Sequence, residues 1–147
     1  MDSKKRHWFW NLILVLTITL CVSALMVHYK NWVKTAPDHI RLLSGFYVEN
    51  VAYSDLDSVV FVERIPPMIR LNGFSALEKE KGIFQEFKDS LTDKKIHVFV
   101  DNISQPKIKL VYKDSLKLYF NLKDSLETDV LFNQLQQKIP AMGMEPN

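Results

Sequence analysis

Residues 107–139 read KIKLVYKDSLKLYFNLKDSLETDVLFNQLQQKI and contain two predicted strands followed by a predicted helix. Lys107–Tyr112 and Leu116–Leu122 both alternate apolar and polar side chains, which is the period of a strand with one buried face. Between them, Asp114 and Ser115 are short polar residues that suit a tight turn. The stretch therefore predicts an antiparallel β-hairpin that packs one face on a core.

A helix over residues 125–139 is expected after this hairpin. Asp124 stands in the N-cap position, and Glu127 three residues later has the spacing of a capping box. Pro140 ends the helical pattern because it lacks a backbone N–H, and residues 140–147 are expected to form a flexible tail. One stripe at helical spacing is expected to face the core: Thr128, Leu131, Phe132, Leu135 and Ile139.

Two more strands are expected earlier in the chain. Ile96–Val100 alternates, whereas Ser58–Val62 is apolar on both faces, which is typical of a more central strand that Pro66 and Pro67 then end. The segment Ser75–Leu91 gives mixed signals, because strong helix formers in its first half are followed by a glycine.

The segment Trp8–Val27, WFWNLILVLTITLCVSALMV, has no charged residue over twenty positions. An α-helix needs about this length to cross roughly 30 Å of hydrocarbon. Aromatic residues lie at both ends of the segment, and basic residues lie just beyond them. We therefore predict a basic tail at 1–7, a single transmembrane helix at 8–28, and a location in the cell membrane, inner or plasma.

Three other interpretations of the apolar segment compete with a membrane span. Residues 22–24 resemble a signal-peptide cleavage site, but the apolar run continues beyond the usual core of about 7–15 residues. Cys21 follows the bulky Leu20, where a lipidation signal requires a small residue. A buried core helix is disfavoured because a chain of this length could not cover a helix that is apolar on every side.

The orientation of the span is predicted from its basic flanks. Three basic residues precede it and three follow it, so the count alone is balanced. Those before the span are contiguous at 4–6, whereas those after it are spread over 30–41. The contiguous cluster favours an amino end inside the cell and a carboxyl-terminal domain outside the cytoplasm.

A linker is expected at 29–38 and one domain at 39–139, which is long enough for a single core. Residues 35–147 hold 14 Lys and Arg against 16 Asp and Glu, a formal charge of −2, so no nucleic-acid partner is expected. The only cysteine, Cys21, lies in the predicted span, and the four histidines lack the spacing of metal ligands. We therefore expect no metal and no cofactor.

Residues 54–59, the stretch IPPMIRLNGFSALEKEKGIF at 65–84 and the later strands resemble the bacterial pleckstrin-homology-like (PH-like) domains. This resemblance covers Ile40–Ile139. It implies a mainly β fold, α+β by count, with a strongly bent antiparallel sheet or partial barrel of about seven strands capped by the carboxyl-terminal helix. It also implies a loop and then a strand at Ile83–Phe87. The residues that carry the resemblance are Arg70, Asn72, Gly73, Phe74, Lys81, Gly82 and Phe84.

Catalytic constellations are not found in the sequence, so we expect a protein that is not an enzyme. No Gly-x-Ser-x-Gly motif occurs, and four glycines are too few for a phosphate-binding loop. The acidic pairs at 55 and 57 and at 78 and 80 lie among polar residues, without an apolar pocket to raise a carboxyl pKa.

We expect a membrane-anchored interaction or scaffolding module with a protein or peptide partner, and strand addition is one possible route. Residues 44–57 carry three acidic and no basic residues, which disfavours an anionic headgroup ligand. Alternatives are a barrel that binds a small ligand or acts as an enzyme, and a headgroup-binding module. The candidate interaction surface, which is otherwise a family-specific turn, consists of Arg64, Arg70, Asn72, Phe74 and Lys81.

Overall fold

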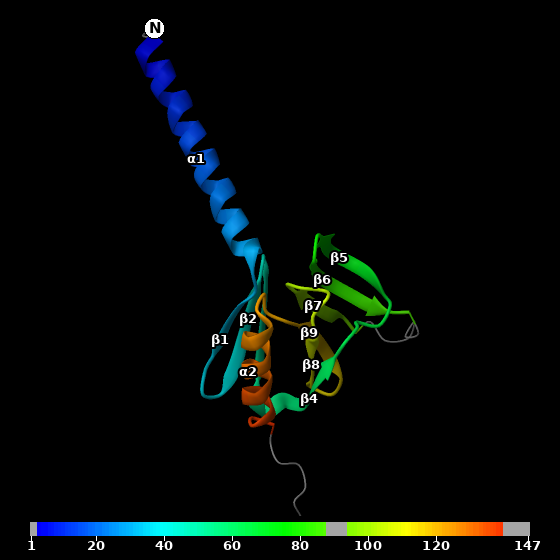
Figure 1. Cartoon of the computed structure of the whole chain (residues 1–147). Coiled ribbons are helices and arrows are strands. Elements are labelled where there is room, and N and C mark those ends of the chain that lie inside the picture. The colour runs from blue at the N-terminus through cyan, green and yellow to red at the C-terminus, as the bar shows by residue number, and fades with distance from the viewer. Residues whose placement is uncertain (1–2, 88–93, 140–147) are drawn as a thin grey trace, which may run out of the picture.

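The computed structural model describes residues 3–87 and 94–139, in which it places two α-helices and nine strands. Figure 1 shows one helix extending alone from a β-rich domain, with the second helix packed on that domain. The protein is therefore mainly β, or α+β by count of elements. In chain order the elements are α1 (Ser3–Tyr29), β1 (Trp32–Thr35), β2 (His39–Ser44), β3 (Tyr47–Ala52), a 3-10 turn η1 (Tyr53–Asp55), β4 (Leu56–Val62), β5 (Met68–Ala76), β6 (Lys79–Glu86), β7 (Ile96–Val100), β8 (Lys107–Tyr112), β9 (Leu116–Phe120) and α2 (Ser125–Gln136).

The described strands form two sheets. β1, β2 and β3 make an antiparallel meander, and the other six strands lie in the order β4-β8-β9-β7-β6-β5. β7 and β9 run parallel, because the β8–β9 hairpin inserts its second strand beside β7. The PH-like resemblance implies one antiparallel sheet of about seven strands. The structure differs by dividing nine strands between two sheets and by containing this parallel pair.

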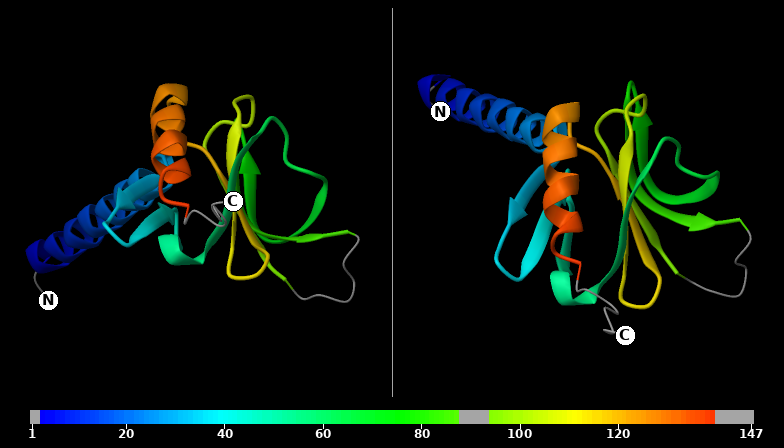
Figure 2. Two further views of the ribbon diagram at one scale, coloured as in Figure 1. Left: turned by 90° about the horizontal axis from the view of Figure 1, so that it is seen from below. Right: turned by 60° about the horizontal axis from the view of Figure 1, so that its bottom comes forward.

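The main core lies where both sheets meet α2, and Figure 2 shows α2 lying between the two sheets. Thr128, Leu131 and Leu135 of α2 are buried there, as the helical stripe predicts. The ring of Phe132 stacks on Phe61 of β4 with centroids 3.9 Å apart. Asp124 caps the helix by accepting a hydrogen bond from the amide of Leu126 at 2.9 Å. The capping residue therefore fixes where α2 begins over the core.

α1 contains an apolar stretch, Arg6–Tyr29, that is long enough to cross a membrane. None of its most apolar window is buried inside the protein, so the interpretation as a buried core helix is excluded. This helix fits a single membrane anchor and also fits a signal sequence.

The prediction of a linker at 29–38 is wrong for its central part, which contains β1. Trp32–Thr35 pairs antiparallel with β2, with Trp32 opposite Leu43 and Thr35 opposite Ile40. A four-residue strand gives too short an alternation to recognise, and this one directly follows an apolar helix. Only the pairing with β2 defines it.

The segment 75–91 differs from the helix that its propensity favours and agrees in part with the loop and strand that the PH-like resemblance implies, because β6 covers residues 83–86 of the strand expected at Ile83–Phe87. β5 and β6 form a hairpin in which Gly73 lies opposite Gly82, so residues 76–81 form the ends of two strands and the tight turn between them, and not a helix or a long loop. A Cβ added at Gly73 would lie 2.1 Å from the carbonyl oxygen of Lys81. This close backbone approach requires glycine, and the strand pairing overrides the helix propensity of the intervening residues. Residues 88–91 lie outside the described part of the chain.

The remaining predictions for the strands are largely confirmed. β7 and β8 have the predicted bounds, and β9 begins at Leu116 but ends at Phe120, two residues early. β4 covers the predicted strand at 58–62 but is an edge strand of its sheet and not a central one. Val59 and Phe61 face the main core and α2, whereas on the other face Val60 is exposed and Val62 packs against a second, smaller core cluster. The predicted tail at 140–147 lies outside the described residues.

Candidate interaction groove and anchor junction

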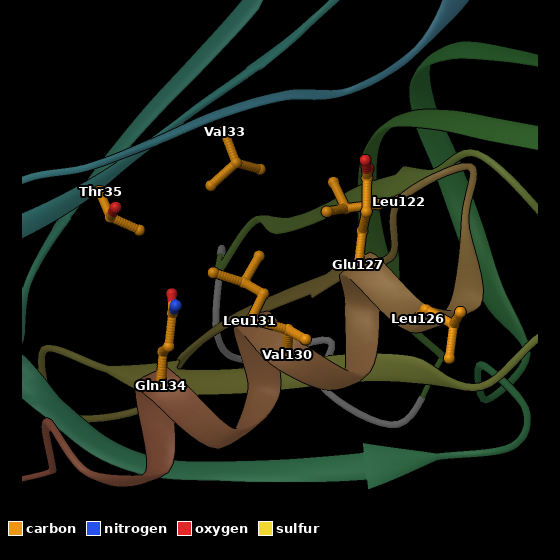
Figure 3. A pocket seen from close by; sticks show the side chains of 8 residues that line it. All are labelled: Val33, Thr35, Leu122, Leu126, Glu127, Val130, Leu131 and Gln134. Atoms are coloured by element: carbon orange, nitrogen blue, oxygen red, sulfur yellow. The ribbon is translucent and has the colours of Figure 1, made fainter.

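A groove of about 410 Å³ lies between β1 and α2. In Figure 3, Val33 and Thr35 project from β1 toward the side chains of α2, and Leu131 faces Val33 across the groove. Polar side chains at three positions accompany five apolar ones. The lining residues are Val33, Thr35, Leu122, Leu126, Glu127, Val130, Leu131 and Gln134.

α2 presents a second apolar pair to this groove, beside its core stripe. Leu126 and Val130 are one helical turn apart and lie on the same face. Their side chains are 71% and 56% exposed. Two large apolar side chains that remain in water on one face of a helix form a surface that a partner could cover with a gain in free energy.

β1 offers free backbone groups along the same groove. The amide of Ala36 donates to the carbonyl of His39 at 2.8 Å, which closes the β1–β2 turn. Because hydrogen-bonded pairs alternate along an antiparallel ladder, the backbone N–H and C=O groups of Val33 and Thr35 point away from β2. Within residues 3–87 and 94–139, no strand pairs with this edge.

The groove therefore combines two properties that suit an extended peptide. Its exposed edge spans about 13 Å, the length of four extended residues. A strand added there would gain backbone hydrogen bonds, and every second side chain would point toward Leu126 and Val130. Glu127 and Gln134 add polar groups along the helix. Backbone bonds would supply affinity, and the apolar wall would supply selectivity.

A cluster of buried polar side chains, separate from the groove, connects the end of α1 to the domain. Asn31 follows the helix and is buried. Its backbone amide donates to Oδ2 of Asp101 at 2.6 Å. Its side-chain amide nitrogen donates to the carbonyl oxygens of Phe99 and Asn121. Asn31 thereby joins the helix end to the ends of β7 and β9.

The same cluster contains a buried ion pair between Lys81 of β6 and Asp101 after β7. Their charged atoms are 2.9 Å apart, and both side chains are 0% exposed. Burial lowers the pKa of Lys81, whereas the hydrogen bond and the charge of Asp101 oppose this shift. The carboxylate of Asp101 thus holds both the lysine and the backbone of Asn31.

Asn121 completes the cluster, which we call the anchor junction: Asn31, Lys81, Asp101 and Asn121. Oδ1 of Asn121 accepts from the amides of Asp101 at 2.8 Å and Asn102 at 3.1 Å. Its side-chain nitrogen donates to the carbonyl of Asn102 at 2.6 Å. These bonds fix the loop after β7, and therefore the position of the Asp101 carboxylate.

Four of the five residues of the predicted interaction surface lie on the β5–β6 hairpin, where Phe74 pairs with Lys81, but the five do not form one exposed surface. Arg64 is exposed in the loop before β5, and Arg70 and Asn72 are exposed on β5, an edge strand. The ring of Phe74 is half-buried and lies 6.0 Å from that of His28 at the end of α1. Lys81 is fully buried in the anchor junction, so it takes no part in a surface.

The sequence interpretation overlooked both the groove and the junction. For the groove, a signal was present, because Leu126 and Val130 form an apolar pair outside the core stripe of the helix. For the junction, the four residues are separated by up to 90 positions, and asparagine beside a strand resembles an ordinary turn residue. No local pattern predicts their convergence.

Glu49 of β3 connects the small sheet to the large one. It accepts from the hydroxyl of Tyr112 at 2.7 Å and lies 3.0 Å from Nδ1 of His97. Burial alone would raise the pKa of the Glu49 carboxyl, but the hydrogen bonds from His97 and Tyr112 together lower it below its usual value. Burial and the hydrogen bond to Glu49 raise the pKa of Tyr112.

Comparisons of the chain with family models, with curated proteins and with solved structures give no match. Among the described residues, no group of three or more His, Cys, Asp or Glu side chains is arranged to hold a metal ion. The candidate site therefore rests on geometry: an apolar groove with a free strand edge, in a β-rich domain that carries an apolar amino-terminal helix.

Proposed function

We propose that the protein is a single-pass, membrane-anchored interaction module, not an enzyme, that binds an extended peptide segment of a partner protein between β1 and α2. The observation that carries this proposal is the free edge of β1, whose outward backbone groups at Val33 and Thr35 lie beside the exposed Leu126 and Val130. A PH-like domain is part of the proposal, supported by the sequence resemblance and by a carboxyl-terminal helix packed at the opening between sheets.

The first experiment identifies and maps the bound peptide. Random extended peptides displayed on phage are selected against the full chain in nanodiscs, and the enriched sequences are synthesised and titrated by fluorescence polarisation. We expect enriched peptides to carry apolar residues at alternate positions. Hydrogen exchange should show new protection at the amides of Val33 and Thr35, because only strand addition pairs these two donors.

Matched variants separate this groove from other apolar surfaces. Val130→Lys places a charge in the groove, and Ile69→Lys makes the same change at an exposed position on β5. We expect Val130→Lys to weaken binding of the selected peptide at least tenfold and Ile69→Lys to leave it unchanged. Equal affinity for all three proteins, or protection that omits Val33 and Thr35, would refute the proposed site.

We propose that the carboxyl-terminal domain lies on the extracytoplasmic side of the membrane. The contiguous basic residues 4–6 before the span support this orientation. Protease added to intact cells should then digest the carboxyl-terminal domain, and a protease-sensitive cytoplasmic marker should survive. Digestion only after permeabilisation would place the domain on the cytoplasmic side without affecting the groove.

A further inference from the structure

Two hairpin turns of the domain lie beside the carboxyl-terminal end of α1. The β2–β3 turn carries Phe46, whose ring lies 4.6 Å from the ring of His28 in an edge-on contact. A Cβ added at Gly45 would lie 2.8 Å from the same histidine ring. Figure 1 shows this turn directly under the end of α1. The turn is therefore packed against the helix where its apolar run ends.

The β5–β6 turn reaches the same level from the other sheet. Lys79, just after the turn, donates through its ammonium group to the last carbonyls of α1, those of His28 and Tyr29. A lysine in this position satisfies carbonyls that have no partner within the helix. The turn residue Leu77 therefore belongs to the hairpin tip that Lys79 connects to the end of α1, and Figure 1 shows this tip at the level of the helix end.

The apolar side chains at the tips of these two turns are exposed to water, which is unfavourable. Leu77 is fully exposed and has a φ of 56°, a left-handed conformation that favours Gly or Asn over a leucine. Phe46 is 78% exposed at its turn. The domain leaves most of both side chains in water, so both suit an apolar environment outside the domain.

Lysines and aromatic rings surround the same end of the helix. Lys123 lies over the ring of Tyr29, 3.9 Å from its centroid, and Lys79 lies over the same ring at 5.2 Å. Lys30 lies over the ring of Trp32 at 4.6 Å. Aromatic rings and lysines are the residues favoured at headgroup level, where lysine ammonium groups meet lipid phosphates.

We infer that Phe46 and Leu77 enter the interface of the bilayer that holds α1, so that the domain contacts the membrane at two points beside its anchor. The inference rests on the membrane anchor of the proposed function, and not on peptide binding. The anchor junction and Lys79 fix the domain to the helix end. The boundary between hydrocarbon and headgroups near Val27 therefore lies beside both tips.

Lipid quenching of a single attached fluorophore tests the inference on the full chain. Phe46→Cys, Leu77→Cys and, as a control, Ser54→Cys are made in a Cys21→Ser background and labelled with an environment-sensitive dye. Ser54 is exposed in η1, which β3 separates from the β2–β3 turn by about 20 Å. The unsubstituted chain labelled at Cys21 reports on the span itself.

The labelled proteins are placed in nanodiscs of phosphatidylcholine that contain a fraction spin-labelled near the top of the acyl chain. We expect quenching at positions 46 and 77 to exceed that at 54 several-fold, with blue-shifted emission at both tips. Quenching at 46 and 77 no greater than at 54, with Cys21 quenched, would overturn the bilayer contact and leave the anchor standing. An unquenched label at Cys21 would overturn the anchor and the bilayer contact together.

Discussion

The anchor junction and the groove beside α2 both lie where separate elements of the fold meet, and they differ in the side chains found there. In the junction, Asn31, Lys81 and Asp101 are buried polar groups that bind one another, so the space is closed from within the chain. In the groove, Leu126 and Val130 are apolar and remain exposed beside an unpaired strand edge. The comparison teaches that polarity alone does not predict which side chains reach the surface: here the charged residues are buried in the junction, and the apolar pair of α2 is exposed.

The largest expected effect is on folding, from removal of one charge in the junction. Asp101→Ala should lower the free energy of unfolding by about 3–5 kcal/mol, because it leaves the buried Lys81 unpaired. Chemical denaturation of the full chain in detergent, followed by circular dichroism, measures the loss. The double variant Lys81→Met with Asp101→Asn should recover most of it, since the asparagine can still accept from the amide of Asn31. A single variant as stable as the parent would show that the pair is not buried.

A smaller loss of stability is expected when the uncharged Asn121 of the junction is replaced. Asn121→Ala should cost about 1–3 kcal/mol, because the amides of Asp101 and Asn102 lose their acceptor. Asn102→Ala is the matched control, since among the described residues its side chain accepts only from the nearby amide of Ser104. The same denaturation measurement applies, and equal effects for the two variants would contradict the assigned role of Asn121.

The contact between the two sheets through Glu49 should depend on pH. The pKa of the Glu49 carboxyl is lower in the folded state than in the unfolded state. Its contribution to the free energy of unfolding is therefore fully present above the unfolded-state pKa and is lost as pH falls through the folded-state pKa. Stability of the parent should therefore decline in acid, and Glu49→Gln should flatten part of that decline. Tyr112→Phe should keep part of the dependence of stability on pH, because His97 remains as a partner of Glu49. Identical slopes for the parent and Glu49→Gln would remove this carboxylate from the acid response.

The smallest effect on folding is expected in the groove. Val130→Lys should change the free energy of unfolding by no more than about 0.5 kcal/mol, because the side chain is already exposed. The same variant is expected to abolish most peptide binding, so stability and binding should separate. A large loss of stability would mean that Val130 belongs to the core, and the contrast with the junction would fail.

Several elements could be predicted because their signals are local. The alternation in Lys107–Tyr112 and Ile96–Val100 predicts β8 and β7 with their bounds, since strand periodicity is contained within each segment. Asp124 predicts the start of α2 because an N-cap depends on residues two positions away. The exposed apolar helix α1 follows from composition and length alone.

Other elements could not be predicted because distant partners define them. β1 exists through its pairing with β2, and β6 replaces a helix-prone sequence because Gly73 and Gly82 allow two backbones to meet. The sequence alone suggests that Lys81 is a surface charge, yet Lys81 is buried, because Asp101 in the loop after β7 neutralises it. The candidate groove depends on how β1 and α2 are placed, and its exposed helix pair was the only local sign of it.

The sequence by itself determined a β-rich domain that carries an apolar amino-terminal helix and ends in a capped helix, since periodicity, capping and hydrophobic length act over a few neighbouring residues. Only the tertiary structure decided which charges are buried and which apolar side chains stay exposed. That outcome depends on contacts between residues as far apart as Asn31 and Asn121, and exposure is a property of the packed molecule.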